Sequence, residues 1–139
     1  MRSLLLVLQP ASMPLVPQTP ATEVYKQILR RQFIDFGRVI VQQLQQQGHL
    51  ADLFDPQTGW PLLSRSGNYR LDDVAVVRAC LGYDTALVAN CALLIHPVWG
   101  QAVYPATVVA SATTAEVAAI AEVVALVGDR KFFFATFAD

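Results

Sequence analysis

Cysteine and histidine are the side chains best suited to chemistry here, and the sequence holds two of each: Cys80, Cys91, His49 and His96. A thiolate acts as a nucleophile or a soft metal ligand, and an imidazole acts as a general base or a metal ligand. Structural metal sites favour close pairs such as Cys-x-x-Cys or His-x-x-x-His, and neither spacing occurs. We therefore expect no metal site.

Cys91 and His96 are also too far apart to form a catalytic dyad. Five residues of strand separate them by roughly 16 Å, at about 3.3 Å per residue. Cys91 follows the polar Asn90 at the start of an apolar segment, so its thiol is either a buried filler or accessible at a strand end. Cys80 lies within a predicted helix and is expected to be structural.

Two carboxylates, Asp52 and Asp55, have the spacing of an acid and base pair. Residues three apart in a strand face opposite sides of the sheet, which argues against a shared site. Asp55 also begins a strong turn signal, in which its side chain closes the turn, Pro56 fixes φ and Gly59 allows a left-handed exit. The segment predicts a tight hairpin with arms at 50–54 and 60–63.

Trp99 and the pair Arg30-Arg31 are the remaining candidates. A tryptophan beside a glycine usually seals a core, and less often lines a pocket or an interface. Two adjacent arginines could grip a phosphate, although such pairs are common on the solvated face of a helix.

The charge balance and length exclude several classes of protein. Ten lysines and arginines against eleven acidic residues give a net charge of −1, which creates no field to attract nucleic acid or anionic membranes. Apolar stretches stay below the roughly 18 residues of a membrane span, and two cysteines are too few for a disulfide scaffold. At 139 residues we expect one soluble cytoplasmic domain.

The elements that must position these residues follow from hydrophobic spacing and capping signals. The opening segment has the apolar character of a strand buried on both faces, and Pro105 makes its own strand an edge, bulged or split one. Strands are expected at 3–9, 86–95 and 101–111, and helices from Pro20 to Gly48, from Asp72 to Gly82 and from Thr113 to 127. Four phenylalanines in 131–137 must pack on the domain, pack on a partner or aggregate. This order predicts an α+β fold with a largely antiparallel sheet.

Three segments together resemble a known family. They are Gly48 to Gly59, Leu81 to Tyr83, and Cys91 to Gly100. In order and spacing they are similar to the C-terminal domain of the methylmalonic aciduria and homocystinuria type D protein family, whose members traffic cobalamin. The resemblance covers roughly residues 3–127, and the chain looks like a short single-domain form that lacks the long N-terminal region of the animal proteins.

The resemblance implies a nitroreductase-like α+β fold that has lost its own flavin chemistry. It implies a mostly antiparallel sheet packed by about three helices, with a single domain at 1–127 and an apolar tail at 128–139. Family members are non-enzymatic adaptors with no tightly bound cofactor. They bind a cobalamin-processing protein that carries the corrinoid, and direct it to cobalamin-dependent enzymes.

The resemblance also implies a site, formed by Asn90, Cys91, His96 and Trp99. In the animal proteins two adjacent cysteines precede the His-x-x-Trp-Gly segment, and the first supplies a thiolate to the cobalt. Here that pair reads Asn90-Cys91, so Cys91 matches the second cysteine. Either a bulge turns Cys91 outward, or the protein does not bind cobalt through sulfur.

Two other classes remain as alternatives. A small flavin- or thiol-dependent oxidoreductase of the same fold would need a phosphate grip, for which Arg30 and Arg31 are the candidates. A self-associating protein would use its sheet edge and apolar tail to form a homodimer.

Overall fold

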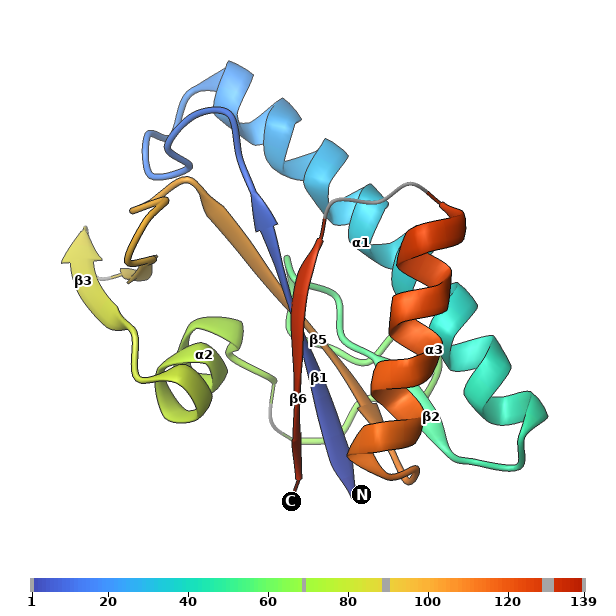
Figure 1. The fold of residues 1–139 in the computed structure, drawn as a ribbon. Helices are drawn as coiled ribbons and strands as arrows, with labels where there is room; N and C mark the ends of the chain where they lie inside the picture. Colours follow the sequence, from blue (N-terminus) through green and yellow to red (C-terminus); the bar gives the residue numbers. More distant parts are fainter. Residues whose placement is uncertain (1, 69, 89–90, 129–131, 139) are drawn as a thin grey trace.

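The centre of the protein is a four-stranded antiparallel sheet with the order β2-β5-β1-β6 (Figure 1). The computed structural model describes residues 2–68, 70–88, 91–128 and 132–138. The sheet consists of β1 (Ser3–Pro10), β2 (Ala51–Leu53), β5 (Val103–Ala110) and β6 (Phe133–Ala138). Both ends of the chain therefore lie side by side, because Ser3 pairs with Ala138.

Three helices and a hairpin cover the two faces of this sheet. Helices α1 (Pro20–Gln46) and α3 (Thr114–Val127) lie on one face. Helix α2 (Asp73–Leu81) and a separate hairpin of β3 (Asp84–Val88) and β4 (Cys91–Ile95) lie on the other. The predicted α+β class, with three helices and a mostly antiparallel sheet, is confirmed.

Strand β1 joins the two halves of the core, as its apolar sequence predicts. Leu5 and Val7 pack with α1 and α3, whereas Leu6 and Leu8 pack with α2 and β4. All four are at most 6% exposed. A strand buried on both faces shows no alternation of polar and apolar residues. The sequence of β1 has this pattern.

The three helices begin close to the predicted positions, each at a capping side chain. The hydroxyl of Thr19 accepts the N–H of Thr22 at 3.1 Å before α1, and Asp72 accepts two N–H groups at the start of α2. Thr113 caps α3 through the N–H of Glu116. The Glu116 side chain does not complete a capping box and instead contacts His49 Nε2 at 2.6 Å.

One predicted strand is wrong. The segment 86–95 is not a single strand, because β3 ends at Val88 and β4 begins at Cys91, and the two pair with each other. The physical reason is that this apolar run contains neither glycine nor proline to signal a turn.

Pro105 is accommodated at a local edge of the sheet. Thr107 and Ser111 bond to Phe54 and Leu50, so the odd-numbered residues of β5 face β2. Pro105 lies on that same side, beyond the residues that β2 pairs. Its missing N–H therefore breaks no bond between paired strands. The expectation of an edge or split strand is wrong for β5 as a whole, which runs unbroken between β2 and β1, because β2 is too short to reach Pro105.

Of the predicted tail, Phe133–Ala138 forms β6, the edge strand beside β1. Phe132 and Phe134 pack against Phe36 of α1, with ring centroids 4.6 and 6.5 Å apart. In the part of the chain that the structure describes, no helix combines the length and hydropathy needed to span a membrane.

Candidate functional site

The turn at Asp55–Gly59 is held by the Asp55 side chain and by a main-chain hydrogen bond. Asp55 Oδ1 accepts the N–H of Gln57 at 2.9 Å, and the Asp55 carbonyl accepts the N–H of Gly59 at 2.7 Å. Gly59 has φ +77°, and a Cβ there would lie 2.5 Å from the Leu71 carbonyl oxygen. The turn is thus fixed against the segment that leads into α2.

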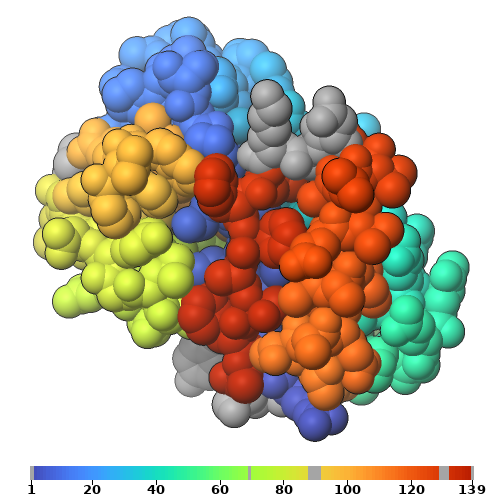
Figure 2. Space-filling model, viewed as in Figure 1, coloured from blue at the N-terminus to red at the C-terminus, as the bar shows by residue number. Residues whose placement is uncertain are grey.

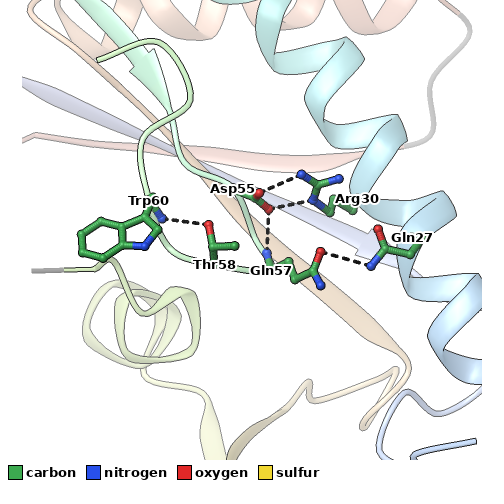
Figure 3. A network of polar contacts seen from close by, with 6 residues as sticks. All are labelled: Gln27, Arg30, Asp55, Gln57, Thr58 and Trp60. Atoms are coloured by element: carbon green, nitrogen blue, oxygen red, sulfur yellow. Dashed lines mark hydrogen bonds and ion pairs between the residues drawn. The ribbon is translucent and has the colours of Figure 1, made fainter. Parts of the chain in front are cut away.

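Arg30 of α1 reaches this turn and pairs with Asp55 (Figure 3). Its Nε and Nη2 donate to the two carboxylate oxygens at 2.8 and 2.7 Å, which is a bidentate ion pair. The guanidinium bond holds the pKa of Asp55 below its usual value, and the same bond raises the pKa of Arg30. Gln27 adds a bond to Gln57 at 3.1 Å. Arg30 is therefore engaged within the fold and is not available to grip a phosphate.

Arg31, the other candidate for a phosphate grip, points away from this network. Its side chain is 80% exposed and lies 3.7 Å from Asp35, one helical turn further along α1. The two arginines thus do not act on one ligand.

A cleft of about 540 Å³ with a mixed polar and apolar lining opens beside the turn. Its walls come from the start of α1, the turn, the start of α2 and β5. Residues that line it include Lys26, Gln57, Arg70, Asp73 and Tyr104. At the start of α2, Asp73 is only 8% exposed and accepts a bond from the Thr107 hydroxyl at 2.7 Å.

Burial dominates the electrostatics at the base of this cleft. Desolvation raises the pKa of Asp73 to about 7, against a bond from Thr107 that favours the charged form. Burial also raises the pKa of Tyr104, and the nearby Asp55 and Asp73 raise it further. The cleft therefore holds a carboxyl group that is largely protonated below neutral pH.

Asp52 has a structural role. Its Oδ1 accepts the N–H groups of Leu53 and Leu63 at 2.7 and 3.1 Å, which holds the return arm of the hairpin near β2. The backbone continues this pairing through Leu62 to Leu53. Asp52 and Asp55 thus serve different parts of the fold.

His96 stabilises the turn between β4 and β5. Its Nδ1 accepts the N–H groups of Val98 and Trp99 at 3.0 and 3.1 Å, so the ring proton lies on Nε2. The ring stacks on Trp99 at 4.0 Å and meets Tyr83 edge-on at 5.1 Å. Burial lowers the pKa of His96, which agrees with this neutral form. With Nδ1 occupied and Nε2 protonated, His96 has no free lone pair for a metal.

Trp99 belongs to an aromatic cluster at this end of the hairpin. Its ring contacts Phe133 of β6 at 4.8 Å. A cavity of about 180 Å³ lies beside the cluster, lined by Tyr83, His96 and Phe133 among others. Trp99 therefore connects the hairpin to the main sheet.

The four residues predicted as a site do not all meet. Cys91 pairs with Val88 at one end of β4, whereas His96 and Trp99 follow its other end. Asn90 and the side chain of Cys91 lie outside what the structure describes. Within the described residues, no group of three or more acidic, histidine or cysteine side chains is arranged to hold a metal ion.

The buried acid was missed from the sequence. Asp73 lies in the expected helix from Asp72 to Gly82 and Tyr104 in the expected strand 101–111, and neither was among the candidate site residues. Only the packing of α2 on β5 buries them. The one available signal was the doubled acid at 72–73, because the cap needs a single carboxylate.

The chain belongs to the family of the methylmalonic aciduria and homocystinuria type D protein. The family model matches residues 4–123, which is most of the 139-residue chain. The family resemblance read from the sequence is confirmed, and it indicates a role in cobalamin metabolism. No curated protein matches the chain significantly.

Proposed function

We propose that this protein is a non-enzymatic cytoplasmic adaptor in cobalamin trafficking, which docks on a partner that carries the corrinoid. The partner would be a cobalamin-processing protein or a cobalamin-dependent enzyme. Family membership over residues 4–123 is the observation that carries the proposal. In the proposed function, the chain binds no cofactor tightly and receives cobalamin as cargo.

The β3–β4 hairpin is the proposed docking surface. Within the described residues it forms a sheet separate from the main one, and Leu87 is 78% exposed on it. Val98, in the turn that follows, is 81% exposed. Exposed apolar side chains on a projecting hairpin favour contact with another protein.

Cys91 is the proposed cobalt ligand, because a soft thiolate suits a corrinoid cobalt and β4 begins at this residue. His96 and Trp99 hold the other end of the hairpin and do not contact the cobalt in this proposal. Asn90, which precedes Cys91 in sequence, would flank the ligand.

The bidentate Arg30–Asp55 pair argues against the flavoprotein alternative. A flavin phosphate bound by Arg30 would have to displace a carboxylate that is only 7% exposed. Removing a partner from a buried charge is costly, so this exchange is unfavourable.

The test is the visible spectrum of a corrinoid bound to its processing protein. Addition of the wild-type chain should shift the absorbance, and Cys91→Ser should abolish the shift. Cys80→Ser is the matched control, since Cys80 lies in α2, and should behave as wild type. A shift that persists in Cys91→Ser would rule out the thiolate ligand, and absence of complex formation would rule out the adaptor role.

A further inference from the structure

Among the described strands, β6 pairs with β1 alone, so one row of its main-chain groups has no partner strand in the part of the chain that the structure describes. In an antiparallel pair, every second residue of a strand forms main-chain hydrogen bonds to the neighbouring strand. The bond from the Ala11 N–H to the Ala102 carbonyl shows that the odd-numbered residues of β1 form these bonds to β5. The even-numbered residues, such as Leu6, then face β6. By the β1–β6 register, Phe133, Ala135 and Phe137 bond to β1. Phe134, Thr136 and Ala138 point their N–H and C=O groups outward.

This edge lies at the surface and lacks the usual protection. Figure 2 shows β6 uncovered between α3 and the α2–β3 region. The strand Phe133–Ala138 contains no charged residue, no proline and no glycine. Natural edge strands normally carry such devices to prevent pairing with another strand. Phe133 is in addition 58% exposed.

Phe133 and Phe137 lie at equal distances along β6 from Ala135. In antiparallel pairing of two copies centred there, Phe134 of one copy faces Thr136 of the other. Both residues point their N–H and C=O groups away from β1, so in this register they can form a hydrogen-bonded pair between the two copies. Phe133 then lies opposite Phe137 in a non-hydrogen-bonded pair, where side chains are closest. Ala135 meets Ala135, and its small side chain allows close approach at the twofold axis.

We propose that two copies of this chain pair through antiparallel β6 strands centred on Ala135, forming a symmetric dimer with a continuous eight-stranded sheet. Phe133 of each copy packs against Phe137 of the other, and the twofold axis repeats this contact. Such an isologous interface is expected of a twofold dimer. The dimer is independent of the proposed corrinoid role, because β6 is not part of the β3–β4 hairpin.

The first test compares Thr136→Pro with Thr136→Ala by light scattering over a dilution series. The wild type should approach twice its 15.2 kDa mass at high concentration. Proline removes one outward N–H and no bond to β1, so Thr136→Pro should remain monomeric. Thr136→Ala keeps that N–H and should dimerise as wild type does. A wild type that stays monomeric, or a proline variant that dimerises equally, would overturn the proposal.

The second test addresses the register. Ala135→Cys, in a background with Cys80 and Cys91 replaced by serine, should form an intermolecular disulfide, because non-hydrogen-bonded pairs bring Cα atoms to about 4.5 Å. Ala138→Cys in the same background should not, since its counterpart across the dimer is Phe132. Circular dichroism checks that each variant folds. Efficient cross-linking at position 138 but not at 135 would show that another register or surface forms the dimer.

Discussion

Asp73 is the residue whose chemistry departs most from its sequence neighbourhood. Its carboxyl is almost fully buried and its only described hydrogen bond comes from Thr107. The acid at the preceding position, Asp72, remains at the surface as the helix cap. Two adjacent identical side chains thus have different roles, which burial alone decides.

We predict that the contribution of Asp73 to stability falls as the pH rises from about 4 to 7. The pKa of Asp73 is about 7 in the folded protein and 3.8 in an ordinary setting, so the folded state binds the extra proton within this window. The part of the unfolding free energy that depends on Asp73 then falls with rising pH, by on the order of 4 kcal/mol. Urea denaturation at several pH values measures this slope.

Asp73→Asn should flatten that slope and be more stable than wild type at pH 8, because no buried charge forms. Asp72→Asn removes a carboxylate from the same helix start but retains a capping side chain, so its slope should stay close to that of wild type, reduced only by loss of the Asp72 charge that helps to raise the pKa of Asp73. A wild-type slope that is unchanged in Asp73→Asn would assign the pH dependence to another group.

The Arg30–Asp55 pair gives a second prediction. Arg30→Gln leaves a buried carboxylate without its partner and should lower the unfolding free energy by about 2 to 3 kcal/mol. Arg31→Gln, at an exposed position, should cost less than about 0.5 kcal/mol. Because the pKa of Asp55 is lowered, the contribution of the pair is complete above about pH 4 and is lost at lower pH.

Chemical denaturation at pH 7 and pH 2.5 tests both parts of this prediction. The difference between wild type and Arg30→Gln should shrink at the lower pH. Equal costs for Arg30→Gln and Arg31→Gln at pH 7 would mean that the bidentate contact is not stabilising.

At the scale of elements, the Asp55–Gly59 turn provides a test of local geometry. Gly48 and Gly59 both have positive φ, but only at Gly59 would a Cβ meet backbone, at Leu71. Gly48→Ala should cost about 1 kcal/mol from φ alone. Gly59→Ala should cost about 2 kcal/mol more, because the turn must move away from residue 71. Thermal unfolding of both variants measures the difference, and equal costs would contradict the close packing.

The turn after β4 should open in acid. Protonation of His96 would put a hydrogen on Nδ1, where Val98 and Trp99 now donate. The lowered pKa of His96 means that its contribution is complete above about pH 6.5 and is lost as the pH falls through the folded value. His96→Ala should cost about 1 to 2 kcal/mol. His96→Asn retains an acceptor for the Val98 N–H and should recover part of this stability.

Trp99 fluorescence reports on this turn, in a variant with Trp60 replaced by phenylalanine. The emission should change in the parent as the pH is lowered from 7 through the folded pKa of His96, which lies below 6.5, and should not change in His96→Ala. An identical acid response in both proteins would place the titrating group elsewhere.

The elements that could be predicted are those defined by local chemistry. The starts of the three helices and the turn at Asp55 each depend on side chains within a few residues, so sequence alone located them. The 84–95 hairpin was not predicted, because its apolar run contains no glycine or proline and only Asn90 as a turn-favouring residue. The pairing of Arg30 with Asp55 and the burial of Asp73 depend on contacts between elements, which a single sequence does not specify.

At the scale of the whole molecule, the strands differ in how many neighbouring strands and apolar layers hold them in place. Strands β1 and β5 are paired on both sides and covered by apolar layers on both faces. The β3–β4 hairpin pairs only with itself and contacts the core mainly through Leu94 and the His96 turn. Local opening should therefore need less free energy in the hairpin than in β1.

Amide exchange followed by NMR gives the final prediction, because it separates the two proposed interfaces. Amides of Leu5 and Val7 in β1 should exchange only through global unfolding, and those of the hairpin considerably faster. Self-association should slow exchange at Thr136 and Ala138, whose N–H groups point outward, and leave Leu87 unaffected. A corrinoid-carrying partner should slow exchange in the hairpin around Leu87 and leave Thr136 unchanged. Protection of both regions by self-association alone would mean that the hairpin belongs to the dimer interface, and that one surface serves both contacts.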